Sequence, residues 1–241
     1  MPDSDALNFD DVPLPSSRGW HSHFGGLEYR CDERGIYLRG VSDGMEPLRS
    51  PGPPTTCQVI WNLCAKYILA ASKKYRVAPE LIMMTIATET GFARNDGFTG
   101  RKTFRWEAHV KVNDVQPPYF GDYSAGPMQT LATTARWVIR QQGLDYDPFA
   151  VAPAIKHKPV PAPDSHPLYD YKTNIDIGTA EIKQRWATTQ DDPIVVSAVF
   201  NAGGKRQSSE NRWHLSTHGD HLDRAAKWYG DACAVVAAAR P

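Results

Sequence analysis

Apolar residues recur at helical spacing in the first half of the chain. In residues 55–75 they return every three or four positions, which predicts an amphipathic helix capped by Thr55 or Thr56. Its expected buried face consists of Val59, Ile60, Leu63, Cys64, Tyr67, Ile68 and Ala71. Residues 79–89 begin with a proline and are apolar on nearly every side, which predicts a buried helix. This second helix ends in Glu89.

Helical spacing returns four more times before the C-terminus. The segments are 128–142, 174–186, 193–200 and 221–239. Between them, residues 91–125 are rich in glycine and proline, and residues 147–167 hold a series of prolines, so both are expected to be irregular. The pattern as a whole predicts a mainly α-helical fold with at most a few short strands in its helical part.

The first 50 residues follow a different pattern. Alternating apolar and polar residues in 27–31 and 36–39 flank a glycine-containing turn, which predicts a β-hairpin. A run of prolines and glycine at residues 50–54 then separates this segment from the helices. We therefore expect a short N-terminal extension, residues 1–50, followed by one helical domain, residues 51–241.

The composition excludes several classes of protein. The chain has 27 Lys and Arg against 27 Asp and Glu, so its zero net charge offers no basis for binding nucleic acid or an anionic membrane. With 41% hydrophobic residues it is too apolar for a disordered chain. No apolar run approaches the roughly 18 residues of a membrane-spanning helix. We expect a globular protein without nucleic-acid partners or membrane insertion.

The cysteines and histidines offer weaker candidates. Four scattered cysteines predict buried thiols, with one disulfide as the alternative, and Cys57 near a helix start leaves a cysteine peptidase open. His214, His218 and His221 resemble metal ligands in type, but Gly219 interrupts the helical spacing that would bring them together. We therefore expect neither a metal site nor a cofactor.

Glu89 is the strongest candidate for chemistry. A carboxylic acid at the end of an apolar helix is poorly solvated, which favours its protonated form and suits a general acid. Taken alone, the same residue fits a structural glutamate that pairs with Arg94 or Arg101. The motifs around it decide between the two interpretations.

Four short motifs follow one another in order. They are Val77-Ala-Pro-Glu-Leu81 with Glu89-Thr-Gly-Phe92, then Gly126-Pro-Met-Gln-Thr130, then Asn174-Ile-Asp-Ile-Gly178, and last Val196-Ser-Ala-Val-Phe-Asn-Ala-Gly203. Each is unspecific alone, but the ordered set resembles the lysozyme-like lytic transglycosylases, including the soluble ones. The resemblance covers roughly residues 77–204 and implies a lysozyme-like fold for the helical domain.

The resemblance also implies a reaction. The expected activity is cleavage of the β-1,4 bond between N-acetylmuramic acid and N-acetylglucosamine in peptidoglycan, with Glu89 as the catalytic acid. The residues implied to bind the glycan strand or orient the acid are Thr90, Gly126, Met128, Gln129, Phe200 and Asn201. The chain departs from the family pattern at Pro127, where leucine is usual, and at Phe200, where the hydroxyl of the usual tyrosine is missing.

The segment between Glu89 and Gly126 leaves two reactions open. It is longer than in the soluble transglycosylases, and goose-type lysozymes have a comparable insertion. A transglycosylase needs one carboxylate, whereas a hydrolytic muramidase normally uses a second. The candidates for the second acid are Asp122, then Glu107, and after them Asp96 and Asp114. Trp106 is a candidate to stack on a sugar ring.

Transglycosylase chemistry is the preferred expectation, because the four motifs match that group best. Hydrolysis by a muramidase is the alternative, and a non-catalytic cell-wall-binding module on the same fold is a third. The first residues are acidic and lack the basic and apolar regions of a secretory signal peptide. We therefore expect synthesis in the cytoplasm and action in the periplasm or cell wall after delivery by a phage or secretion system. Delivery machinery and an immunity protein are the expected protein partners.

Overall fold

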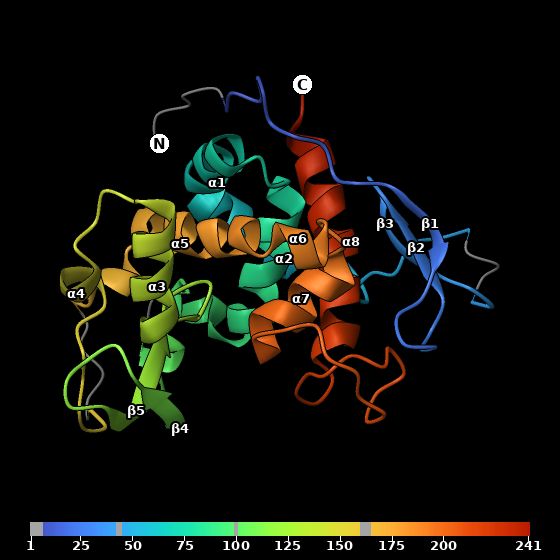
Figure 1. The fold of residues 1–241 in the computed structure, drawn as a ribbon. Coiled ribbons are helices and arrows are strands. Elements are labelled where there is room, and N and C mark those ends of the chain that lie inside the picture. Colours follow the sequence, from blue (N-terminus) through green and yellow to red (C-terminus); the bar gives the residue numbers. More distant parts are fainter. Residues whose placement is uncertain (1–6, 42–44, 99–100, 160–164) are drawn as a thin grey trace. The chain divides into compact units, whose positions relative to one another are not determined.

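The computed structural model describes residues 7–41, 45–98, 101–159 and 165–241 (Figure 1). The predicted mainly α-helical fold is confirmed, with 47% of the chain helical and 14% in strands. Two compact units form, one from Met1–Thr88 with Arg185–Pro241 and the other from Glu89–Gln184. No helix of the described segments has both the length and the apolar character that crossing a membrane demands. The division of the chain into residues 1–50 and 51–241 stays a prediction.

The first unit contains a small antiparallel sheet. Its strands are β1 (Arg18–His21), β2 (Tyr29–Asp32) and β3 (Gly35–Leu38), in that order. The last two form the predicted hairpin, with Tyr29 opposite Leu38 and Asp32 opposite Gly35. Strand β3 packs against α8 (His221–Ala239), where Gly35 and Gly230 allow the two backbones to approach closely (Figure 1).

Helices make up the rest of this unit. They are α1 (Thr55–Tyr75), most of α2 (Pro79–Thr90), α6 (Trp186–Thr189), α7 (Pro193–Ala202) and α8. Helix α8 packs against both α1 and α7. The helices expected at 55–75 and 221–239 are confirmed, but two details are wrong. Pro54 precedes α1 without a side-chain cap, and Leu63 is 41% exposed because the buried face is rotated towards Cys57 and Trp61.

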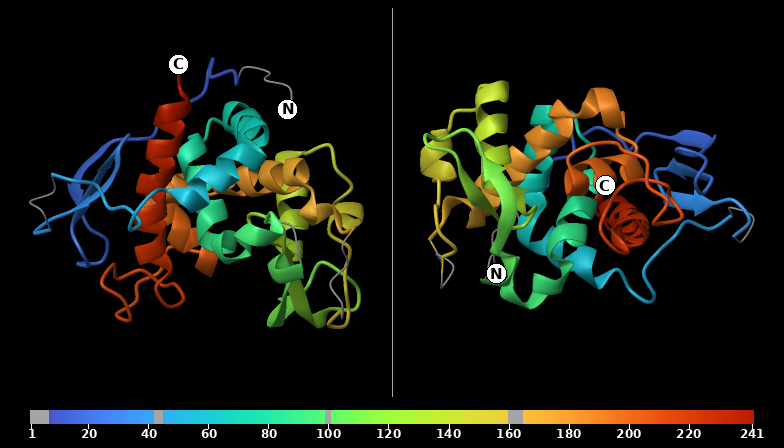
Figure 2. Two further views of the ribbon diagram at one scale, coloured as in Figure 1. Left: turned by 180° about the vertical axis from the view of Figure 1, so that it is seen from behind. Right: turned by 60° about the horizontal axis from the view of Figure 1, so that its bottom comes forward.

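The second unit combines helices with another antiparallel sheet. Its elements are the short 3-10 helices η2 (Gly91–Asp96) and η3 (Arg101–Thr103), strands β4 (Arg105–Val112), β5 (Tyr119–Ala125) and β6 (Thr130–Leu131), helices α3 (Ala132–Gln142) and α4 (Pro148–Val151), the 3-10 helix η4 (Pro167–Tyr169), and α5 (Tyr171–Gln184). Helix α3 packs against α4, α5 and β5 (Figures 1 and 2).

The β4–β5 hairpin corrects the expectation that residues 91–125 are irregular. Residues 105–112 (Arg-Trp-Glu-Ala-His-Val-Lys-Val) alternate between polar and apolar side chains, which is a strand signal, whereas the residues of β5 show no such alternation. The helix expected from residue 128 begins later, at Ala132. Gln129 has a left-handed backbone and residues 130–131 pair with β5, which delays the start of the helix.

All four cysteines are free and buried. The expected buried thiols are confirmed and the alternative of a disulfide is wrong. Burial raises the pKa of Cys31 and of Cys64 to about 12, and it raises the pKa of Cys57 still further. Since a thiolate is the nucleophile in a cysteine peptidase, the environment of Cys57 disfavours that chemistry.

Candidate active site

Glu89 is the second-last residue of α2. The side chains before it are buried from Leu81 to Thr88, whereas Glu89 itself is half-buried. The hydroxyls of Thr85 and Thr88 donate to carbonyl oxygens one turn earlier, at 2.9 and 2.7 Å, so these buried threonines leave no polar group unsatisfied. The helix therefore carries a carboxylate from an apolar interior to a partly solvated end.

Thr90 attaches this end of α2 to the loop of residues 126–129. Its buried hydroxyl donates a 2.8 Å hydrogen bond to the carbonyl oxygen of Pro127. The hydroxyl of Thr90 is thus engaged inside the protein. The backbone next to Glu89 is thus held against this loop.

Asn174 of α5 holds the loop from the other side. Its Oδ1 accepts from the backbone N–H of Met128 at 2.8 Å, and its Nδ2 donates to the carbonyl oxygen of Ala125 at 2.9 Å. Gly126 lies between these contacts with φ +77°, and a Cβ at this position would come within 2.6 Å of Asn174 Nδ2 and would also overlap the carbonyl oxygen of Leu168. Only glycine fits this backbone and this space.

Met128 packs on the same helix one turn further along. Its side chain is fully buried, and a Cβ on Gly178 would lie 2.5 Å from Met128 Sδ. Asn174 and Gly178 are four residues apart and therefore share one face of α5. The sequence analysis assigns no site role to either residue. The spacing of the Asn-Ile-Asp-Ile-Gly motif is the signal that could have identified both.

Gln129 braces the loop internally. Its Nε2 donates to the carbonyl oxygens of Gly126, at 3.0 Å, and of Thr103, while its Oε1 accepts from Ser124 Oγ at 3.1 Å. The residue is buried and has φ +49°, a strained backbone that these bonds stabilise. Gln129 therefore shapes the loop, and direct contact between its amide and a sugar stays a prediction.

Asp122 is buried and acts on the start of α3. Its Oδ2 accepts from the backbone N–H of Thr133 at 3.0 Å and also from the Thr133 hydroxyl. Helix α3 has no side-chain cap of its own, so Asp122 takes over that function from β5. Burial raises the pKa of Asp122, although its hydrogen bonds with Thr133 oppose the shift.

The other candidate acids lie in different environments. Glu107 is half-buried on β4, directly opposite Asp122, so the two side chains share a face of the sheet. Asp114 accepts two hydrogen bonds from the buried Arg136, at 2.5 and 2.9 Å. Burial opposes ionisation of Asp114, but these bonds outweigh it and lower its pKa. The side chain of Asp96 lies outside the described part of the structure.

Trp106 lies on the opposite face of the hairpin from Glu107. It is half-buried and stands opposite Tyr123. Its ring covers Gly121 so closely that a Cβ there would overlap it. One side of the indole is therefore occupied by the protein's own backbone. Stacking of a sugar on the indole stays a prediction.

Phe200 and Asn201 belong to the first unit, in the last turn of α7. Both are half-buried, and Asn201 Oδ1 accepts from the backbone N–H of His218 at 3.2 Å. This bond fixes the amide with its Oδ1 towards His218 and its Nδ2 on the opposite side. Their expected contact with the substrate stays a prediction.

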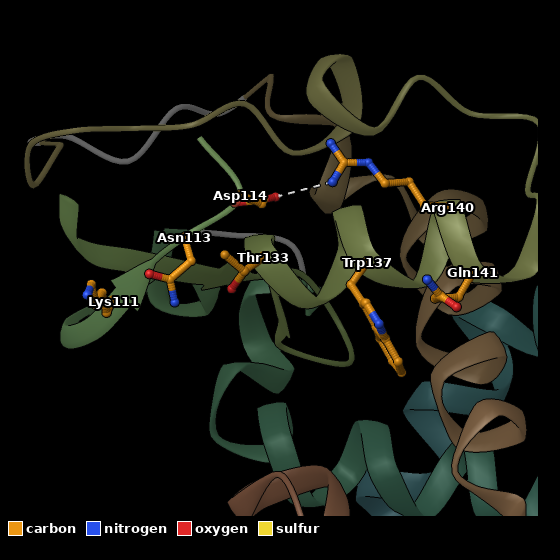
Figure 3. A pocket seen from close by; sticks show the side chains of 7 residues that line it. All are labelled: Lys111, Asn113, Asp114, Thr133, Trp137, Arg140 and Gln141. Atoms are coloured by element: carbon orange, nitrogen blue, oxygen red, sulfur yellow. Dashed lines mark ion pairs between the residues drawn. The ribbon is translucent and has the colours of Figure 1, made fainter. Parts of the chain in front are cut away.

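A pocket of about 350 Å³ lies beside α3 in the second unit (Figure 3). It is lined by Lys111, Asn113, Asp114, Thr133, Trp137, Arg140 and Gln141. Trp137 is 38% exposed, and Arg140 lies 3.9 Å from Asp114. The lining therefore combines one indole with cationic, anionic and amide side chains.

Comparison with known proteins does not identify a family for this chain. No protein-family model matches the chain, and no match was found among curated proteins.

Proposed function

We propose that this chain cleaves the β-1,4 bond between N-acetylmuramic acid and N-acetylglucosamine in peptidoglycan. The proposed reaction is that of a lytic transglycosylase on a lysozyme-like fold, with Glu89 as its one catalytic carboxylate. The proposed place of action is the periplasm or cell wall, after delivery from the cytoplasm by a phage or secretion system. Delivery machinery and an immunity protein are the proposed protein partners.

The contacts among three of the four sequence motifs carry this proposal. Thr90, beside Glu89, bonds to Pro127, and the loop of residues 126–129 is in turn held by Asn174 and Gly178. These motifs are separated by dozens of residues in the chain. Contacts of this kind are expected if the three motifs together form one site, and they support the proposal on that ground.

The proposed chemistry needs one group that first donates and then accepts a proton. Protonated Glu89 donates to the glycosidic oxygen, so the bond from that oxygen to C1 of the muramic acid breaks and N-acetylglucosamine leaves as an alcohol. The C6 hydroxyl of the same muramic acid then loses its proton to the Glu89 carboxylate and attacks C1. The product is a 1,6-anhydro ring, and Glu89 is protonated again.

The neighbouring acids support the single-carboxylate reaction. Asp122 is engaged with Thr133 at the start of α3, and Asp114 is paired with Arg136. Asp122 Oδ2 and both oxygens of Asp114 already accept hydrogen bonds from these partners, which favours a structural role for each carboxylate. Glu107, half-buried on β4, and Asp96, whose side chain lies outside the described part of the structure, remain candidates for a hydrolytic mechanism.

Mass spectrometry of the soluble products from purified sacculi tests the proposal. Wild type should release muropeptides with 1,6-anhydro ends, one water lighter than hydrolysis products. Glu89→Gln should release almost none, while Glu210→Gln, a matched change at an exposed glutamate, should behave as wild type. Reducing muramic acid ends would instead establish the hydrolase. Binding to sacculi without product from wild type would leave only the wall-binding module.

A further inference from the structure

Two histidines and an aspartate converge in the first unit. His21 Nε2 lies 2.7 Å and His23 Nε2 lies 3.8 Å from Asp192 Oδ2. The ligand atoms of all three lie within 4.8 Å of one another. Within residues 7–41, 45–98, 101–159 and 165–241, no other group of three such side chains meets this spacing.

Asp192 is oriented so that one oxygen faces the histidines. Its Oδ1 accepts from the Tyr29 hydroxyl at 2.8 Å and from the backbone N–H groups of Ile194 and Val195, at 3.0 and 3.1 Å. These donors hold the carboxylate at the start of α7 and leave Oδ2 directed at the imidazoles. Hydrogen bonds of this kind are the usual support of a carboxylate that binds a metal.

His21 has the corresponding support. Its Nδ1 lies 2.7 Å from the carbonyl oxygen of Gly19, to which an N–H at this position donates. Nε2 is 2.7 Å from Asp192 Oδ2, a hydrogen bond whose proton a metal ion would replace. This arrangement, with a backbone carbonyl behind the ring, is typical of histidine ligands in metal sites.

His23 lies at ion-pair distance from Asp192 Oδ2, but its Nε2 makes no hydrogen bond within the described segments. A hydrogen bond between His21 and Asp192 would satisfy both of those side chains. His23 Nε2 is buried, yet 3.8 Å is too long for a hydrogen bond to Asp192, and no other hydrogen-bond partner lies within the described segments. A buried ring nitrogen without a hydrogen bond costs free energy unless something else binds it.

One cationic side chain, Arg18, already lies near the same oxygen. Arg18 Nε lies 4.0 Å from Asp192 Oδ2, and the Tyr29 ring packs against His21 with ring centres 4.3 Å apart. Asp192 is only 2% exposed, so its charge is poorly screened by water. A bound metal ion would replace the proton between His21 and Asp192 and would also bind the Nε2 of His23.

We propose that His21, His23 and Asp192 form a binding site for a divalent transition metal ion, with zinc as the best match. Imidazole nitrogens with one carboxylate oxygen suit zinc and its neighbours in the first transition row, whereas magnesium and calcium prefer sites built of oxygen. The ion would tie β1, which ends at His21, to the start of α7. It would thereby join chain segments 171 residues apart and stabilise the first unit.

A comparison of zinc binding by wild type and by His23→Ala tests this inference. The substitution removes one of the three ligands and leaves the contact between His21 and Asp192 in place. Isothermal titration of metal-free full-length protein with zinc chloride should give one saturable site per chain in wild type. The affinity should fall by more than about tenfold in His23→Ala. His157→Ala, at an exposed histidine of the other unit, controls for surface histidines and should bind as wild type does.

Thermal unfolding supplies a second measurement that does not depend on catalysis. Zinc should raise the unfolding temperature of wild type, and His23→Gln should lose this increase even if His23→Ala folds poorly. Magnesium chloride should have no such effect. Equal zinc affinity in wild type and His23→Ala, or no saturable site in wild type, would overturn the inference and leave His21 and Asp192 as a plain ion pair.

Discussion

The hydroxyl of Thr90 donates to the carbonyl oxygen of Pro127, 37 residues further along the chain, at 2.8 Å. This bond joins the end of the helix that carries Glu89 to the loop of residues 126–129. Thr90 is thus a positioning residue for the proposed acid.

Thr90→Val should test that positioning function, because valine keeps the shape of threonine and removes the donor. Misplacement of the carboxylate should lower kcat between about ten- and a hundredfold with little change in KM. Thr90→Ser should restore most of the activity, since it restores the donor. Steady-state kinetics on soluble glycan strands measures both values. A Thr90→Val enzyme with wild-type kcat would show that the bond serves stability alone.

Asp122 should act as a cap for α3. Asp122→Ala should lower the free energy of unfolding by about 1–2 kcal/mol, because the N–H of Thr133 loses its acceptor. Asp122→Asn keeps an acceptor oxygen and should cost less. Chemical denaturation measures these differences, and both variants should still release anhydro products. Loss of cleavage in a fully stable Asp122→Asn would instead identify Asp122 as the second carboxylate of a hydrolase.

Gly178 should tolerate no side chain. A methyl group there would lie 2.5 Å from Met128 Sδ, so Gly178→Ala should destabilise the protein by about 1–3 kcal/mol and displace the loop of residues 126–129. Gly204→Ala is the matched control, because the nearest atom to its added methyl group is 3.9 Å away. Gly178→Ala should have a lower unfolding temperature and should cleave sacculi more slowly than Gly204→Ala. Equal stability of the two would contradict the packing argument.

Glu80 should make stability depend on pH. Burial raises its pKa to about 7, and Arg240, 3.8 Å away, only partly opposes this. The folded state therefore binds a proton more tightly than the unfolded state. The free energy of unfolding should fall as the pH rises from about 4.5 to 7 and should then level off.

Glu80→Gln should remove this dependence, because glutamine is neutral at every pH. The variant should be more stable than wild type at pH 8, by at most a few kcal/mol, since one pKa unit corresponds to about 1.4 kcal/mol. Denaturation at several pH values between 4 and 8 measures the difference. A slope near pH 6 that is the same in both proteins would show that another group titrates.

Periodicity in the sequence was sufficient to predict a helix or a hairpin wherever one local pattern specified that element. The helices at 55–75 and 221–239 and the hairpin around Gly35 follow their apolar spacing. The position of Glu89 at the end of a buried helix was equally predictable. Burial along a helix has a local signature, because side chains three or four residues apart share a face.

The tertiary structure decided the features that depend on distant residues. Strand β4 alternates polar and apolar residues but β5 does not, so the register of their hairpin is defined only by the pairing of the two strands. The contact of Asp122 with α3, the contacts of Asn174 and Gly178 with the 126–129 loop, and the meeting of His21 with Asp192 join segments whose separation carries no periodic signal. The sequence by itself determined where the long helices lie, but it did not predict the start of α3 at Ala132 or the short helix α4. Which residues meet was decided by chain packing, because contacts between distant segments depend on the whole fold rather than on local spacing.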